Sequence, residues 1–170
     1  MPEKLLSEPW LRGTHADIPA VHRAVLHALE LAHEDVHRWC GPLTDDQMNR
    51  RPSQLAPVAF HLRHIARSLD RLLTYAEGGS LNEIQLAALQ SELAPHATRD
   101  ELFAELSEAL ASSAARVRNL CQADLESART VGQKKLPATL GGLLVHIADH
   151  TQRHVGQAIT TAKIVLAQSP

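Results

Sequence analysis

Three histidines recur at four-residue intervals in the stretch HIADHTQRHVGQ, residues 146 to 157. An α-helix turns about 100° per residue, so His146, His150 and His154 fall at about 0°, 40° and 80° and share one face. Imidazoles one turn apart can bind the same cation, with each nitrogen about 2.0–2.1 Å from it. The spacing therefore indicates a metal site on this helix.

A third ligand has to come from another helix, because two helical histidines rarely hold an ion alone. The stretch FHLRHIARSLDRLL offers His61 and His64. His64 shares a helix face with Phe60 and Ser68, which suits packing toward the interior. His61 lies about 60° away from that face. We therefore expect His64 to be the third ligand. On spacing alone, hydrogen-bonded core histidines remain an alternative.

Four segments carry the periodicity of amphipathic helices, and none shows the sustained alternation typical of strands. We expect helices from about Asp17 to Trp39, from near Pro57 to Gly78-Gly79, from Thr98 to about Leu120, and from Pro137 or Thr139 to about Ala167. The sequence therefore predicts an all-α fold, a four-helix bundle. LNEIQLAALQ is expected to form a short additional helix or lid between the second and third helices, before Pro95.

The segments between these helices are expected to be connections, including LTDDQMNRRPSQLA and the polar QADLESARTVGQKK. Thr98 with Glu101 three residues later has the spacing of a capping box, which predicts the start of the third helix. Gly41-Pro42 predicts the end of the first helix.

Length, charge and hydropathy limit the function. We expect one domain over residues 1–170, with an N-terminal extension at 1–15. A net charge of −2 leaves no basic surplus for nucleic acid. No apolar run approaches the 18 or so residues of a membrane helix, and MPEKLLSEPWLRG carries charges where a signal peptide needs an apolar core. We therefore expect a cytoplasmic protein that binds neither nucleic acid nor a membrane.

The stretches PVAFHLRHIARSLDRLLTY and LGGLLVHIADHTQRHVGQAITTAK, taken together, resemble the DinB/YfiT-like superfamily of metal-binding four-helix bundles. In that family a histidine followed by an aliphatic residue on the second helix joins an H-x-x-x-H pair on the fourth, often followed by x-G-Q. Here those positions are His64, His150 and His154, with Gly156 and Gln157 completing the pattern. LTDDQMNRRP also looks like the family's connection into the second helix, so the resemblance spans nearly the whole chain.

The resemblance implies one divalent ion, zinc or nickel, in an open three-histidine site, often with homodimerisation. Characterised relatives include transferases and isomerases that use low-molecular-weight thiols such as bacillithiol or mycothiol. The leading expectation is therefore a metal-dependent transferase in which the ion activates such a thiol toward a small-molecule substrate. A metal-dependent hydrolase and a metal-binding or dimerising module without turnover are the alternatives.

The remaining histidines have weaker indications. We expect a pocket or core role for His146 rather than ligation, and Gln157 is expected to line the pocket. On the first helix, His33 and His37 either form a polar helix edge or line a pocket wall near the metal. By helical position, His22 and His33 lie on the flank nearest the core and His27 on the opposite side. Asp149 is expected to be solvated or ion-paired.

Two further patterns point to no site. A di-iron carboxylate centre needs Glu-x-x-His from each of two helices. Glu30 with His33 and Glu34 with His37 have that spacing, but both pairs lie on the first helix. The cysteines, Cys40 and Cys121, are expected to be free thiols, because a chain of this size does not need a disulfide.

Overall fold

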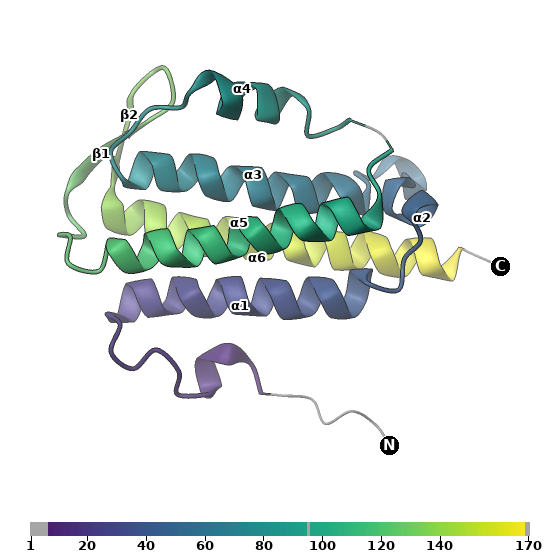
Figure 1. The fold of residues 1–170 in the computed structure, drawn as a ribbon, viewed down its shortest axis with the longest axis horizontal. Helices are drawn as coiled ribbons and strands as arrows, with labels where there is room; N and C mark the ends of the chain where they lie inside the picture. Colours follow the sequence, from purple (N-terminus) through teal and green to yellow (C-terminus); the bar gives the residue numbers. More distant parts are fainter. Residues whose placement is uncertain (1–6, 95, 169–170) are drawn as a thin grey trace.

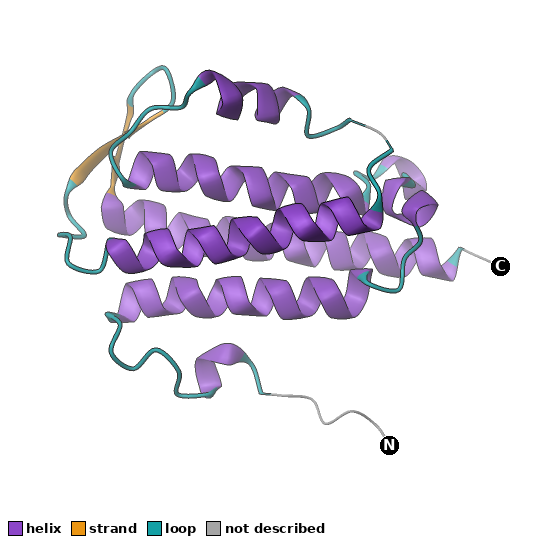
Figure 2. Ribbon diagram, viewed as in Figure 1, coloured by secondary structure: helices purple, strands orange, loops and turns teal. Residues whose placement is uncertain are grey.

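The computed structural model describes residues 7–94 and 96–168. Its elements in chain order are η1 (Pro9–Leu11), α1 (Ala20–Cys40), α2 (Asp45–Asn49), η2 (Pro52–Gln54), α3 (Val58–Ala76), α4 (Glu83–Gln90), α5 (Arg99–Asn119), β1 (Ala128–Val131), β2 (Leu136–Thr139) and α6 (Leu140–Ala167). The four long helices lie side by side, so the predicted all-α bundle is confirmed (Figures 1 and 2). Residues 1–6 of the expected extension, and Pro95, lie outside the described residues.

The bundle has a square arrangement in which each long helix packs against two others. α6 packs against α1 and α3, and α5 packs against the same two helices. The α3–α6 edge and the α1–α5 edge therefore lie on opposite sides of the bundle. Fully buried aliphatic side chains fill the centre, among them Leu62, Leu69, Leu106, Leu144 and Ile147. No helix in the described part of the chain combines the length and hydropathy needed to cross a membrane.

Capping boxes begin three of the helices. Thr98 accepts a hydrogen bond from the backbone N–H of Glu101 at 3.3 Å, and the Glu101 carboxylate accepts one from the Thr98 N–H at 2.9 Å. The capping box predicted for α5 is therefore present. Thr44 with Gln47 caps α2 in the same way, and Asn82 with Gln85 caps α4. α2 lies inside a segment expected to be only a connection; its Thr-x-x-Gln spacing is the signal for it.

We expect Thr98→Ala to lower the free energy of unfolding by about 1 kcal/mol, because the backbone N–H groups at the start of α5 lose their side-chain acceptor. Urea unfolding followed by circular dichroism measures the change. Thr160→Ala is the matched control. Its hydroxyl is exposed and donates to the Gly156 carbonyl within α6, so an effect below about 0.5 kcal/mol is expected. Equal effects of the two substitutions would contradict the capping role.

A short hairpin precedes α6, where the sequence predicted a polar connection without strands. β1 and β2 pair antiparallel in the register Ala128 opposite Thr139. Each strand has only four residues, too few to show a clear alternation of polar and apolar side chains. Gly132, with φ of +71°, lies in the turn and adopts a backbone conformation that favours glycine. Arg129 fastens the hairpin to α3 by donating to the Ala76 carbonyl at 2.6 Å.

Both cysteines are free, as expected. Cys40 is fully buried at the end of α1. Burial raises the pKa of its thiol to about 12, so the thiolate does not form at neutral pH. Cys40 therefore acts as a small core side chain.

The helix expected between the second and third long helices is present as α4. Its bundle-facing side is polar. Gln85 donates to the Asp70 carboxylate of α3 at 2.7 Å, and Arg67 of α3 donates to the Ala88 carbonyl at 2.8 Å. These contacts hold α4 and the residues that follow it against α3 (Figure 1).

Candidate metal centre

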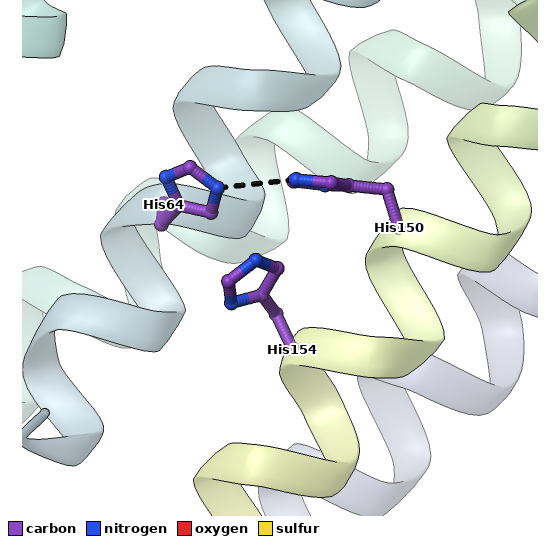
Figure 3. A group of neighbouring side chains, drawn as sticks. All are labelled: His64, His150 and His154. Carbon is purple, nitrogen blue, oxygen red and sulfur yellow. Dashed lines mark hydrogen bonds between the residues drawn. The ribbon is translucent and has the colours of Figure 1, made fainter. Parts of the chain in front are cut away.

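The α3–α6 edge brings three histidines together. His64 comes from α3, and His150 and His154 come from adjacent turns of α6 (Figure 3). One ring nitrogen of each lies within 4.8 Å of the other two, and the His64 and His150 Nε2 atoms are 3.2 Å apart. Two nitrogens bound to one tetrahedral ion at 2.0–2.1 Å are about 3.3–3.4 Å apart. The three side chains predicted as ligands therefore converge at a spacing that suits a cation.

A buried carboxylate orients His64. Glu92, two residues beyond α4, accepts a hydrogen bond from His64 Nδ1 at 2.7 Å through Oε2. Its other oxygen, Oε1, accepts one from Arg71 of α3, also at 2.7 Å. The exposed fraction is only 5% for Glu92 and 9% for Arg71. A carboxylate that holds the Nδ1 proton leaves His64 Nε2 with a free lone pair, as in many metal-binding histidines.

The ionisation of Glu92 follows from these partners. Burial alone would raise the pKa of its carboxyl group, but the hydrogen bonds from His64 and Arg71 together lower the pKa below its ordinary value. Glu92 is therefore a carboxylate at neutral pH. It is the residue of the site that the sequence analysis missed, because the chain around it carries no motif.

His150 is oriented by a weaker contact. Its Nδ1 lies 3.4 Å from the Ser68 hydroxyl, which itself donates to the Ile65 carbonyl at 3.1 Å. With the hydroxyl proton used for Ile65, His150 donates to the hydroxyl from Nδ1 in the tautomer that an ion requires. The proton on Nδ1 again leaves Nε2 free. Without an ion, a proton on one Nε2 of the His64–His150 pair makes the hydrogen bond of 3.2 Å between them.

His61 lies beside the triad, although the sequence analysis placed it off the ligand face. It is only 5% exposed, and its Nδ1 is 3.1 Å from Nδ1 of His154. One of the two rings donates in this contact and the other accepts. When His154 donates, its Nε2 is free, and Figure 3 shows one of its ring nitrogens facing His64 and His150. An offset of about 60° on the helix does not exclude the contact, because an imidazole is long enough to reach across it.

Three histidines at this edge, His61, His150 and His154, are neutral at neutral pH. Burial, followed by the charges of neighbouring histidines, lowers the pKa of His61, His150 and His154 to about 4. An imidazole must be deprotonated to bind a metal ion. The site is therefore ready to accept a cation without first releasing protons from these three rings.

These lowered pKa values predict how the stability of the metal-free protein depends on pH. The folded pKa of about 4 lies below the ordinary value of 6.5, so between these values the unfolded chain binds more protons. Stability is therefore fully present above pH 6.5 and is lost as the pH falls toward 4. We expect the melting temperature in a chelating buffer to fall by about 10 °C between pH 6.5 and 5. Calorimetry measures this change. The His154→Phe variant should show a smaller dependence of melting temperature on pH. A wild-type melting temperature that does not change with pH would contradict the burial of these rings.

The other predicted residues of α6 are exposed. His146 is exposed, so the core role considered for it is wrong, and its ring centroid lies 5.4 Å from that of His150. Gln157 is also exposed. Asp149 pairs with Arg153 one turn later, as expected for an ion-paired residue.

His33 and His37 do not join the triad, and His33 is exposed, so its predicted place on the flank nearest the core is wrong. Their ring centroids lie 4.3 Å apart on α1 with the rings tilted, and His37 packs edge-on against Phe103 of α5 at 4.7 Å. They therefore belong to the α1–α5 edge, across the bundle from the metal centre. Helical periodicity gives the face of a helix on which a residue lies, but not which neighbouring helix covers that face.

His22 and His27 are both buried. His22 lies on the core flank as expected, with 1% exposure, and its Nε2 donates to the Leu120 carbonyl at 3.1 Å. His27 points away from the core as expected, yet only 8% of it is exposed. The N-terminal segment covers it, and Thr14 lies 3.0 Å from its Nε2.

Comparisons with known proteins agree with this architecture. The family model of the DinB superfamily matches residues 28–158, which include the three histidines and Glu92. A crystal structure of a conserved protein from Enterococcus faecalis superposes with a TM-score of 0.61 at 22% identity, covering 87% of this chain and 98% of that one. This likeness shows a shared fold. No curated protein matches the sequence. The family match and the helical bundle together show that the chain belongs to the DinB superfamily.

Proposed function

We propose that the protein binds one divalent metal ion through Nε2 of His64, His150 and His154. The observation that carries the proposal is the convergence of these rings while hydrogen bonds engage the opposite nitrogen of each. Three neutral imidazoles suit zinc, nickel, cobalt or copper, whereas magnesium and calcium prefer oxygen ligands. Zinc and nickel are the ions that the family resemblance favours.

The triad fits an open, reactive type of site. Three protein ligands leave a coordination position for a substrate, and the three histidines are only partly buried. When bound, the ion would supply a Lewis acid that lowers the pKa of a thiol or a water molecule. Within the chain, Glu92 holds the His64 proton at Nδ1, and Phe60 stacks on the His64 ring with centroids 5.3 Å apart. These contacts keep His64 from turning away from the site.

We further propose that the reaction is the transfer of a low-molecular-weight thiol to a small electrophile. Glu92 is the carboxylate that hydrogen-bonds to the triad, and both of its oxygens are already used by His64 and Arg71. It is therefore poorly placed to take a proton from an attacking water. A thiol is acidic enough to lose its proton to solvent once its pKa is lowered, so the sulfur of the thiolate can attack an electrophilic carbon without a protein base. A carbon–sulfur bond forms, and the bond from that carbon to its leaving group breaks, releasing the group as an anion, chloride in the case of monochlorobimane. A metal-bound water with a pKa of about 7 also loses its proton to solvent, so the preference for thiol transfer over hydrolysis comes from the family resemblance to thiol-dependent enzymes.

The test compares thiol transfer with hydrolysis directly. Zinc- or nickel-loaded protein is incubated with monochlorobimane and bacillithiol, mycothiol or glutathione, and the conjugates are measured by mass spectrometry. We expect conjugation above the uncatalysed rate, lost in His154→Ala. Turnover of p-nitrophenyl acetate without a thiol would instead support a hydrolase. Bound metal with neither activity would overturn the enzyme proposal and leave a metal-binding module.

A further inference from the structure

A second group of metal-ligating side chains lies where the N-terminal segment covers α1. His27 and Glu30 are three residues apart on α1 and so share a face, and His15 reaches them from the segment before the helix. One donor atom of each lies within 4.8 Å of the other two. We infer that His15, His27 and Glu30 form a second binding site, for Zn²⁺ or a similar ion, separate from the α3–α6 triad.

The backbone holds His15 in an unusual position. Its φ of +56° lies in the left-handed region, which is unfavourable for residues other than glycine and persists only where the surroundings impose it. Its Nε2 lies 2.6 Å from Glu30 Oε1. The segment is also held one turn further along α1, where Arg12 makes a bidentate ion pair with Glu34 at 2.6 and 2.7 Å. His15 is thus held against Glu30 before any ion binds.

The donor set matches that of open zinc sites. Two imidazoles and one carboxylate are common ligands of zinc, at about 2.0–2.2 Å. Donor atoms around one such ion are about 3.3–3.5 Å apart. The His15 and Glu30 donors, at 2.6 Å, must separate slightly, and the His27 ring must exchange its contact with Thr14 for the ion.

The side chain of Arg118 must move when an ion binds His15. It is exposed on α5 and lies 3.2 Å from His15 Nδ1, where a guanidinium can only donate. His15 therefore carries its proton on Nε2, facing Glu30. An ion at Nε2 displaces that proton to Nδ1, and Arg118 turns toward solvent. Removing the Arg118 side chain should consequently strengthen the site instead of weakening it.

Open space lies on either side of the cluster. A cavity of about 330 Å³ between α1 and α5 is lined by His15 and Glu30, and one of about 310 Å³ under the N-terminal segment is lined by His27. A water molecule can therefore complete the coordination. The ion would join the N-terminal segment to α1, which gives the site a stabilising role independent of the reaction at the triad.

The test is zinc stoichiometry by equilibrium dialysis and plasma mass spectrometry on the full chain. We expect two ions for the wild type, one for His154→Ala, one for Glu30→Gln and none for the double variant. Glu30→Gln preserves the shape of the side chain but removes the anionic ligand, so its fold should be retained. His33→Ala is the matched control, because His33 lines the same cavity without belonging to the cluster; it should keep both ions. Arg118→Ala should also keep both.

The variants distinguish failure of the second site from failure of the triad. In the His154→Ala variant, zinc bound at the second site should raise the melting temperature. Adding Glu30→Gln to this variant should abolish that rise. If the His154→Ala variant binds no zinc when zinc is in excess, the second site does not exist. The same follows if adding Glu30→Gln to this variant leaves its zinc binding unchanged, and the cluster is then a hydrogen-bonded contact only. A wild type that binds a single ion, lost in Glu30→Gln but kept in His154→Ala, would instead support the second site while contradicting the triad.

Discussion

Replacing His150 with alanine should abolish stoichiometric zinc or nickel binding at the α3–α6 edge. His150 supplies the Nε2 atom 3.2 Å from His64 Nε2, and two imidazoles alone hold an ion poorly. Loss of an outer-shell partner weakens metal binding by about 10–100-fold, and loss of a ligand should cost more, on the order of 1,000-fold. Competition with a chromophoric chelator measures the change. The parent and the His150→Ala protein should both carry Glu30→Gln, so that the second cluster does not bind zinc.

His146→Ala is the control for this substitution. It removes an imidazole one turn away on the same helix, and its ring lies beside His150, but it does not belong to the converging group. It should therefore leave the affinity within a few-fold. A loss caused equally by His146→Ala and His150→Ala would contradict the assignment of ligands, as would full retention of the ion in His150→Ala.

Glu92→Ala should have the second largest effect, on both stability and metal affinity. It leaves the guanidinium of Arg71, only 9% exposed, without its carboxylate, and breaking a buried ion pair in this way costs about 3 kcal/mol. In a chain of this length that lowers the melting temperature by about 6–12 °C. Without Glu92, no carboxylate orients the His64 ring, so zinc binding should also weaken by about 10–100-fold. Calorimetry and chelator competition measure the two effects.

Glu105→Ala provides the comparison for Glu92→Ala. Glu105 pairs with Arg67, also on α3, at the same 2.7 Å, but its side chain is 35% exposed and is not bonded to a triad histidine. A surface pair contributes about 0–1 kcal/mol, so this variant should melt close to the wild type and bind zinc normally. Glu92→Gln should recover part of the affinity, because the amide oxygen can still accept from His64. A Glu92→Ala variant with wild-type zinc affinity would contradict the positioning role.

The sequence predicted those parts of the molecule that depend on local pattern. The long helices follow from hydrophobic periodicity, and α5 begins at the capping box that Thr98 and Glu101 form. The convergence of His64 with His150 and His154 followed from i, i+4 spacing and the family motif. These features need only the geometry of single helices and the knowledge that two of them are adjacent.

The missed features depend on tertiary contacts between distant segments. Glu92 reaches a histidine 28 residues earlier only because polar contacts hold α4 against α3. His27 is buried by a segment that carries no helical period of its own. His33 and His37 lie on the α1–α5 edge because of how the helices are arranged around the bundle, which periodicity alone does not specify.

The central claim is that one ion lies between α3 and α6, held by three histidine nitrogens. An anomalous difference map from crystals of the zinc-loaded protein, recorded at the zinc edge, tests it most directly. We expect a peak about 2.0–2.1 Å from Nε2 of His64, His150 and His154, with Glu92 still bonded to His64 Nδ1. Zinc-loaded crystals with no peak at this position, or with an ion bound there by other residues, would contradict the account.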